Sequence, residues 1–302
     1  MNRNSFLLGL FSIGGQVLLL RELVSSLNGD ELFIGTALFG WLLSVAWGAY
    51  LEGKTKSKSK PRVLFAIGAV FLPLTIIGIR LLPLMVTRIV GEVIPFSSAA
   101  FISVISVLPV SIISGMLFTS ITSKGHRPAA SIIQVYLFEG LGAFIGGLAT
   151  IMLVGNIFST LGMALSLGII VVIVNSFFYQ GRRIILPAVA ALICLVIIKY
   201  AIPPLDNYLD TVKYKSYRVK QSFDTPYGHQ IILERDKAIT LVSDNTVEAT
   251  YPDLLTAENL LIPPLLYRPQ GARILYIGRA ELGIMQLADS VPGINLTALD
   301  AR

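Results

Sequence analysis

The chain has 302 residues, of which 54% are hydrophobic and only 14% are charged. Soluble globular domains carry about 25% charged residues, so this composition excludes an ordinary soluble protein and predicts a membrane protein. The formal net charge of +6 comes from residues 1–202, which hold 14 Lys and Arg against 6 Asp and Glu. Such an excess is typical of cytoplasmic membrane loops beside anionic lipid, and we expect no nucleic-acid partner.

Metal and disulfide chemistry find little support in the composition. Cys194 is the only cysteine, which excludes disulfides and cysteine-based metal sites within the chain. His126 and His229 lie far apart in the sequence, so we expect no metal site from them.

Seven apolar runs in residues 1–202 predict a multi-pass α-helical membrane bundle. Each is close to the ~20 residues needed to cross the hydrocarbon core of a bilayer. The runs cover residues 6–24, 31–51, 63–82, 97–119, 130–153, 158–178 and 184–201. Pro203 and Pro204 are expected to end the last helix, because proline cannot continue one.

Basic loops predict the orientation of the bundle. Three loops fall on one side of the predicted bundle and contain Lys54, Lys56, Lys58, Lys60 and Arg62, then Lys124 and Arg127, then Arg182 and Arg183. This side should be cytoplasmic. Seven spans would place residues 203–302 outside the cell, whereas basic residues between Lys199 and Lys220 favour the cytoplasm. We expect a cell (inner) membrane protein with a cytoplasmic C-terminal part and one span miscounted.

Polar side chains within the apolar runs form a candidate membrane polar site, to which we assign Gln16, Arg21 and Glu139. Ionisable groups at membrane depth are costly and usually face a bundle interior or a cavity. Arg21, with Glu22 beside it, favours a paired or snorkelled anchor at the interface. For Glu139, a buried hydrogen-bonding role and a cation or transport role are both open.

Residues 203–250 predict a small antiparallel β unit and residues 251–302 an α/β unit. Apolar residues alternate at 221–223, 230–233 and 239–242, and turn residues separate these stretches. A helix is predicted from Asp253 to Leu266, followed by a strand at 273–278, a helix at 280–289 and a strand at 294–300. Strand, glycine turn, helix, strand and acid form the opening of a Rossmann-like nucleotide-binding domain.

This order of elements resembles the start of a spermidine synthase (polyamine aminopropyltransferase) domain. The membrane part is similar to the membrane-fused bacterial members, whose N-terminal halves resemble half a major-facilitator transporter. The likeness rests on Phe11–Gln16 with Arg21 and Gly29, and on Tyr136–Ala143. The resemblance implies transfer of an aminopropyl group from decarboxylated S-adenosylmethionine to a polyamine, without a permanently bound cofactor.

The resemblance also implies ligand-binding positions. Gly278, Glu281 and Asp300 match the co-substrate loop and the later acid of the second strand, and Tyr227, Asp244 and Glu258 match substrate-side positions. Several positions depart from the family pattern: Gly228, Glu248, Ala257, Arg279, Ala280, Leu282 and Ala298. The chain is expected to end inside the domain, before the loops that carry the catalytic aspartates, so no catalytic residue is assigned.

Three interpretations follow. The first is a membrane-anchored spermidine synthase-like protein that is inactive as this chain alone, either a fragment or one half of a split enzyme completed by a separate chain. The second is a non-enzymatic transporter-like or scaffold protein that binds a polyamine or other small cation in the bilayer. The third is a methyltransferase-like domain that uses S-adenosylmethionine.

Overall fold

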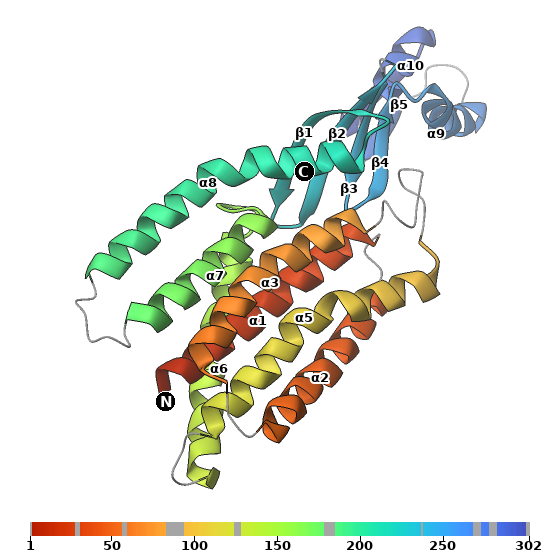
Figure 1. The fold of residues 1–302 in the computed structure, drawn as a ribbon. Coiled ribbons are helices and arrows are strands. Elements are labelled where there is room, and N and C mark those ends of the chain that lie inside the picture. Colours follow the sequence, from red (N-terminus) through yellow and green to blue (C-terminus); the bar gives the residue numbers. More distant parts are fainter. Residues whose placement is uncertain are drawn as a thin grey trace.

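The computed structural model describes residues 2–27, 31–55, 59–82, 94–123, 128–177, 185–236, 238–267, 273–277 and 283–299. Within these ranges the first two thirds of the chain fold into long helices that run side by side, with a β-sheet at one end (Figure 1). The helices are α1 (Asn2–Ser26), α2 (Glu31–Lys54), α3 (Pro61–Leu81), α5 (Phe96–Thr122), α6 (Pro128–Leu153), α7 (Thr160–Phe177) and α8 (Ile185–Lys213).

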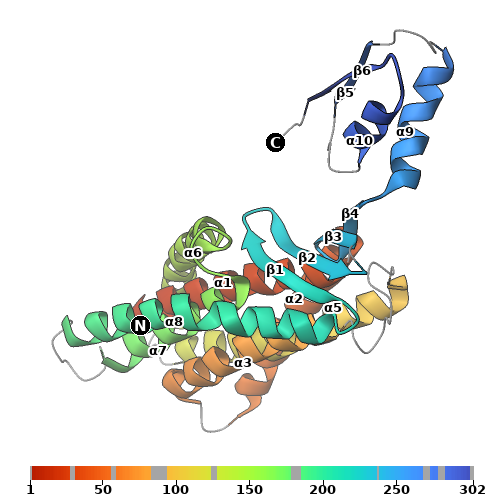
Figure 2. The ribbon, with the colours of Figure 1, turned by 90° about the horizontal axis from the view of Figure 1, so that it is seen from above.

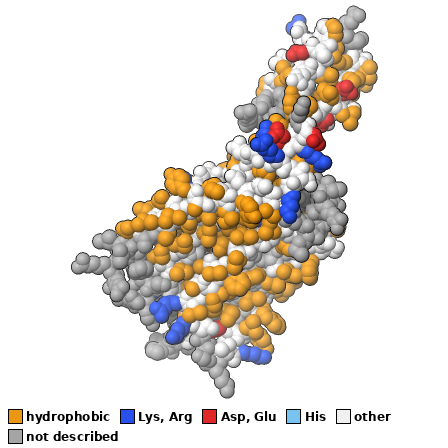
Figure 3. Space-filling view, turned by 45° about the horizontal axis from the view of Figure 1, so that its top comes forward, with side chains coloured by type: hydrophobic (Ala, Val, Ile, Leu, Met, Phe, Trp, Pro, Cys, Tyr) orange, Lys and Arg blue, Asp and Glu red, His pale blue; other side chains and the backbone are white. Residues whose placement is uncertain are grey.

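Six of these helices are long and apolar enough to cross a membrane, namely all except α7. Their outer faces carry exposed Leu, Ile, Val and Phe side chains, which cover much of the visible bundle surface in Figure 3. Exposure of so much apolar area is unfavourable in water but not in lipid. The chain is therefore a membrane protein, as its composition predicts. The helix at 158–178 is present as α7, which is shorter than the other six.

The core of the bundle forms around α1, which packs against α3, α5, α6 and α7. Phe11, Leu18 and Leu19 of α1 are fully buried, and the ring of Phe11 meets that of Phe65 edge to face at 6.4 Å. Glycines bring α1 and α6 together: a Cβ on Gly142 would collide with the backbone of Phe6. Close approach of this kind is how small residues join membrane helices.

The expectation that Pro203 and Pro204 end the last helix is wrong. Both lie inside α8, which continues to Lys213. Each proline removes one hydrogen bond to the carbonyl four residues earlier, but the helix resumes because residues beyond them have tertiary partners. Asp206 and Asp210, one turn apart on one helix face, bind side chains of α3 and of the β-sheet.

The segment after the bundle is a four-stranded antiparallel sheet, here called the β unit, with order β1-β2-β3-β4. Its strands are β1 (Arg218–Thr225), β2 (Gly228–Arg235), β3 (Ala238–Ser243) and β4 (Thr246–Tyr251). The predicted hairpins are confirmed, and β4 is an additional strand. Asp244 and Asn245 both adopt positive φ in the β3–β4 turn, which gives the two-residue geometry that suits the twist of a hairpin.

The last part, the α/β piece, contains α9 (Leu254–Tyr267), β5 (Arg273–Ile277), α10 (Ile284–Ser290) and β6 (Asn295–Leu299). β5 and β6 pair in parallel, with α10 between them in the chain. Figure 2 shows this piece beyond β4 and away from the bundle. Both predicted helices and both predicted strands are therefore present among the described residues.

Candidate functional site

The three residues assigned to the co-substrate, Gly278, Glu281 and Asp300, lie outside the residues that the structure describes. Their positions in space therefore remain predictions of the sequence.

The three substrate-side residues are described, and the structure does not bring all of them together. Tyr227 stands in the β1–β2 turn and is 96% exposed, and Asp244 lies near it, since a Cβ on Gly228 would touch the Asp244 carboxylate. Glu258 is exposed on α9, which packs against α10 beyond the β unit (Figure 2).

The predicted membrane polar site is also divided. Gln16 is half-buried on α1. Glu139 lies level with Gly9, whose Cβ would meet the Glu139 carbonyl, while Arg21 is twelve residues further along α1, about 18 Å at 1.5 Å per residue. Oε2 of Glu139 is buried without a hydrogen-bond partner among the described residues. Glu139 and Arg21 thus belong to different levels of the bundle.

Arg21 is an anchor between α1 and the β unit. Its guanidinium donates hydrogen bonds to the carbonyls of Thr225, Pro226 (3.1 Å) and Gly228 (3.4 Å) in the β1–β2 turn. Arg21 therefore fixes the β1–β2 turn against the end of α1.

The principal cluster of buried charge lies where the bundle meets the β unit, and it consists of two trios. In the first, Arg80 of α3 joins Glu22 of α1 to Asp206 of α8. Its Nε and Nη2 donate to the two Glu22 oxygens at 2.8 and 3.1 Å, and its Nη1 donates to Asp206 Oδ1 at 2.6 Å. Bidentate, charge-assisted bonds of this kind are among the strongest in proteins.

In the second trio, His229 of β2 joins Asp210 of α8 to Asp224 of β1. Nδ1 of His229 lies 2.9 Å from Asp224 Oδ1, and Nε2 lies 3.1 Å from Asp210 Oδ2. A neutral imidazole would place a bare nitrogen lone pair against one of the carboxylates, so both nitrogens carry protons and His229 is an imidazolium. Ser222 donates to Asp210, and the Thr160 amide of α7 donates to Asp224 Oδ2 at 2.8 Å.

The pKa values outside the membrane spans agree with this assignment. Burial alone would lower the pKa of His229, but its hydrogen bonds to Asp210 and Asp224 outweigh burial and raise it to about 10. Burial alone would raise the pKa of Asp224, yet the bond to His229 holds it well below its usual range. Burial raises the pKa of Asp244, which accepts a 2.9 Å hydrogen bond from the His229 amide.

Sequence reasoning missed these trios. Arg80 and Glu22 are 58 residues apart, and Arg80 and Asp206 are 126 apart, so spacing gives no indication of the contacts. One local signal was present: Asp206 and Asp210 are spaced i and i+4 shortly after Pro203-Pro204, where the last helix was expected to end.

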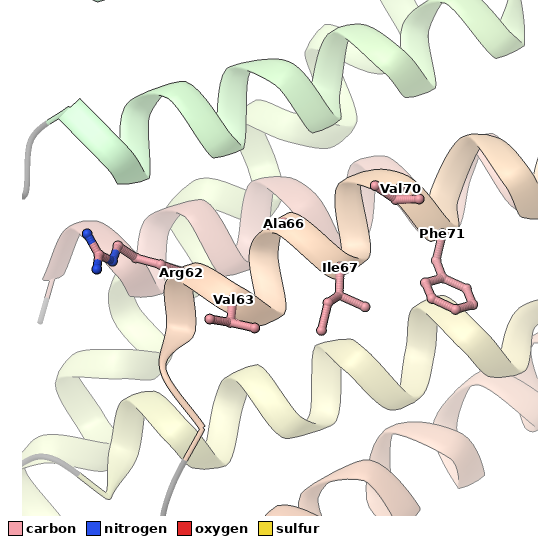
Figure 4. A pocket seen from close by; sticks show the side chains of 6 residues that line it. All are labelled: Arg62, Val63, Ala66, Ile67, Val70 and Phe71. Carbon is pink, nitrogen blue, oxygen red and sulfur yellow. The ribbon is translucent and has the colours of Figure 1, made fainter.

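Beside the trios lies a cavity of about 240 Å³, here called the seam cavity, between the α6–α7 loop, α8 and the β1–β2 hairpin. Its charged lining residues are Asp206, Asp224 and His229. A larger groove of about 610 Å³ runs along α3 from Arg62 to Phe71, and Figure 4 shows its apolar side chains. Because it lies on a membrane span, lipid tails account for it.

Within the described residues, no group of three or more His, Cys, Asp or Glu could hold a metal ion. In the second trio both nitrogens of His229 already face carboxylates, which leaves neither of them available to a metal.

No protein-family model matches the chain, and no curated protein or solved structure matches it either.

Proposed function

We propose that the chain is the membrane-anchored part of a spermidine synthase-like protein, in which aminopropyl transfer requires a separate chain that completes the α/β domain. The proposed activity is inferred from the resemblance in sequence, and its substrates are decarboxylated S-adenosylmethionine and a polyamine. The bundle, which resembles half a major-facilitator transporter, holds the soluble part at the cell membrane.

The observation that carries this proposal is the uncovered face of the β5–β6 pair. Leu275 is 59% exposed, Ile277 is 68% exposed and Leu299 is 54% exposed, and the strand register places Ile277 directly beside Leu299. Parallel sheets are normally covered on both faces, and here α10 covers one. Further strands and helices from a partner would bury these side chains.

The described residues also support an inactive state of this chain on its own. The carboxylate of Asp244 already accepts the amide of His229, and Glu258 lies on α9, beyond the β unit. A polyamine needs several carboxylates that converge on one cleft, and the two described carboxylates assigned to the substrate do not converge.

The test is equilibrium binding of radiolabelled decarboxylated S-adenosylmethionine and of S-adenosylmethionine to the full chain. Binding is measured in membranes of the producing cells and again after purification in detergent. We expect saturable binding of the decarboxylated compound in membranes, weakened by Asp300→Asn but not by Asp236→Asn, and lost when purification removes the partner. A preference for S-adenosylmethionine would favour the methyltransferase interpretation, and binding of neither would contradict the proposal.

A second candidate is the non-enzymatic transporter-like or scaffold role, and the directions of the helices favour it. α1, α3, α6 and α8 all end at the β unit, where Glu22, Arg80 and Asp206 meet. At the other end of the bundle, Ser59 forms hydrogen bonds with Glu52 of α2 and Ser120 of α5, beside basic residues such as Arg62. If that end is cytoplasmic, the β unit lies outside, away from a cytosolic nucleotide-like co-substrate.

Glu139 provides the test of this second role. Oε2 of Glu139 is buried at membrane depth and has no hydrogen-bond partner in the described part of the chain, which makes it a candidate cation contact. Under this role Glu139→Gln should reduce uptake of radiolabelled spermidine into vesicles that contain the full chain, whereas Gln134→Glu should not. Unchanged uptake together with unchanged thermal stability would assign Glu139 a passive position.

A further inference from the structure

The seam cavity combines a charged floor with an apolar mouth. Its charged residues, Asp206, Asp224 and His229, are largely buried, and His229 has a side chain that is only 14% exposed. The mouth includes the more exposed Ile157, Pro203 and Phe223, with Phe158 beside them. The cavity holds about eight waters at ~30 Å³ each, which is more than a bare ion requires and is close to the size of a small organic ligand.

The cavity wall carries one uncompensated negative charge. Asp206 and Asp224 are two carboxylates, and His229 is one cation. The surrounding groups do not remove the excess, since Arg80 is shared by Glu22 and Asp206, and His229 also bonds Asp210. Nearby, three positive charges come from Arg21, Arg80 and Lys213. Three negative charges balance them, from Glu22, Asp210 and Asp244. Burial of an unbalanced charge is costly, so one monovalent cation would complete the site.

One acceptor in the wall is still without a partner. Oδ1 of Asp206 accepts from Arg80, whereas Oδ2 is buried and has no hydrogen bond among the described residues. The Ser159 hydroxyl lies near this carboxylate but does not reach ordinary hydrogen-bond geometry with Oδ2. An oxygen with two free lone pairs in a polar cavity calls for an N–H or O–H donor.

The apolar residues at the mouth indicate the chemistry of the part of the ligand that carries no charge. Phe158 and Phe223 come from the α6–α7 loop and from β1, and Pro203 comes from α8, so three elements form one hydrophobic rim. A hydrated metal ion would gain nothing from this rim. An alkyl chain would bury apolar area against it, and aromatic faces also attract organic cations.

We propose that the seam cavity binds a small primary alkylammonium ion, with its ammonium group on Asp206 and Asp224 and its alkyl chain along Phe158 and Phe223. The ammonium donates to Asp206 Oδ2 and balances the negative charge of the wall. The site is separate from every position assigned above to the aminopropyl substrates, and it does not depend on the proposed function.

The probe is propylammonium chloride, titrated calorimetrically into the full chain in phosphatidylcholine nanodiscs at constant ionic strength. We expect saturable binding that is about tenfold tighter than that of methylammonium, since two CH₂ groups contribute about 0.8 kcal/mol each. Tetramethylammonium, which has no N–H donor, and neutral 1-propanol should each bind at least about tenfold more weakly than propylammonium. Equal affinity for propylammonium, sodium and 1-propanol would overturn the proposal.

Three variants test whether the ligand binds in the seam cavity. Asp206→Asn should weaken propylammonium binding at least about tenfold, and the exposed Asp236→Asn should leave it unchanged. Phe223 lies outside the two trios of buried charges, so Phe223→Ala should fold even if Asp206→Asn does not. It therefore tests the site independently. It should remove most of the preference for propylammonium over methylammonium. Wild-type affinity in Asp206→Asn, or an unchanged preference in Phe223→Ala, would overturn the site.

Discussion

At the scale of single residues, Arg80 joins three helices at the end of the bundle that meets the β unit, and His229 joins the β unit to α8. Arg80 and His229 each bind two carboxylates, and each pair of carboxylates comes from two different elements. Replacement of one partner leaves the others as buried charges, which costs more than the loss of a surface ion pair. The attachment of the β unit should therefore depend on a few side chains.

His229→Gln tests this dependence. Glutamine keeps hydrogen-bonding capacity but removes the positive charge between Asp210 and Asp224, so we expect the β unit to lose about 3 kcal/mol of stability. Hydrogen exchange of residues 218–235, followed by mass spectrometry, should then become faster. Lys220→Gln is the control, because the Lys220–Glu234 pair lies at the surface and is worth about 1 kcal/mol or less. Equal protection in both variants would contradict the role of His229.

The same residue predicts a dependence on pH. The pKa of His229 is about 10 in the folded chain, against an ordinary value of about 6.5. Because the folded-state pKa is the higher one, protonated His229 contributes its full stabilisation below about pH 6.5 and loses it as the pH rises towards 10. The urea midpoint for cleavage within the β unit, measured by pulse proteolysis, should fall from pH 6 to pH 9 more steeply in the wild type than in His229→Gln. Parallel slopes would be the contrary result.

At the scale of elements, the contact between α1 and α6 depends on glycine. A Cβ on Gly142 would collide with the Phe6 backbone, whereas a Cβ on Gly140 would meet nothing within 4 Å. Gly142→Ala should therefore destabilise the bundle by about 1–3 kcal/mol through overpacking. Gly140→Ala should be neutral or slightly stabilising, since alanine favours helix by up to about 1 kcal/mol. Thermal midpoints by circular dichroism in detergent compare the two, and equal midpoints would refute the packing argument.

The elements themselves were largely predictable from the sequence. Apolar runs and alternation located the helices of the bundle and three strands of the β unit, because local periodicity determines which face is buried. Close packing of Gly142 and Gly146 against α1 follows the same local spacing, and Gly146 lies against Leu10. α8 was predicted too short, because Pro203-Pro204 are strong helix terminators in isolation and long-range bonds of Asp206 and Asp210 outweigh them.

The contacts that join the end of the bundle to the β unit were not predictable in the same way. Glu22, Arg80, Asp206 and His229 come from four elements, and their contacts exist only after the bundle has formed. His229 was considered only as a metal ligand, and Asp224 was assigned no role. Single-sequence patterns report local periodicity, so a site built from pairs 58 and 126 residues apart leaves no pattern to find.

At the scale of the whole molecule, the two ends of the bundle differ in chemistry. Charged side chains gather near the β unit and again at the opposite end, and hydrophobic side chains cover the surface between them (Figure 3). Arg62 and Arg80 mark the two ends of α3 and are 18 residues apart, about 27 Å along the helix. A bundle of this length places its ends on opposite sides of a bilayer, so the location of the β unit follows once one end is assigned.

Cysteine labelling assigns the ends. In a Cys194→Ser background, Thr55→Cys marks the end of α2 with the basic loops, and Tyr227→Cys marks the exposed β1–β2 turn. We expect a membrane-impermeant maleimide to label only one of the two in intact cells and both after lysis. Labelling of both in intact cells, or of neither, would contradict the arrangement of the helices. Protection of Tyr227→Cys would place the β unit in the cytoplasm and support aminopropyl transfer. Protection of Thr55→Cys, which the positive-inside rule predicts, would favour the non-enzymatic role and place the seam cavity on the external side.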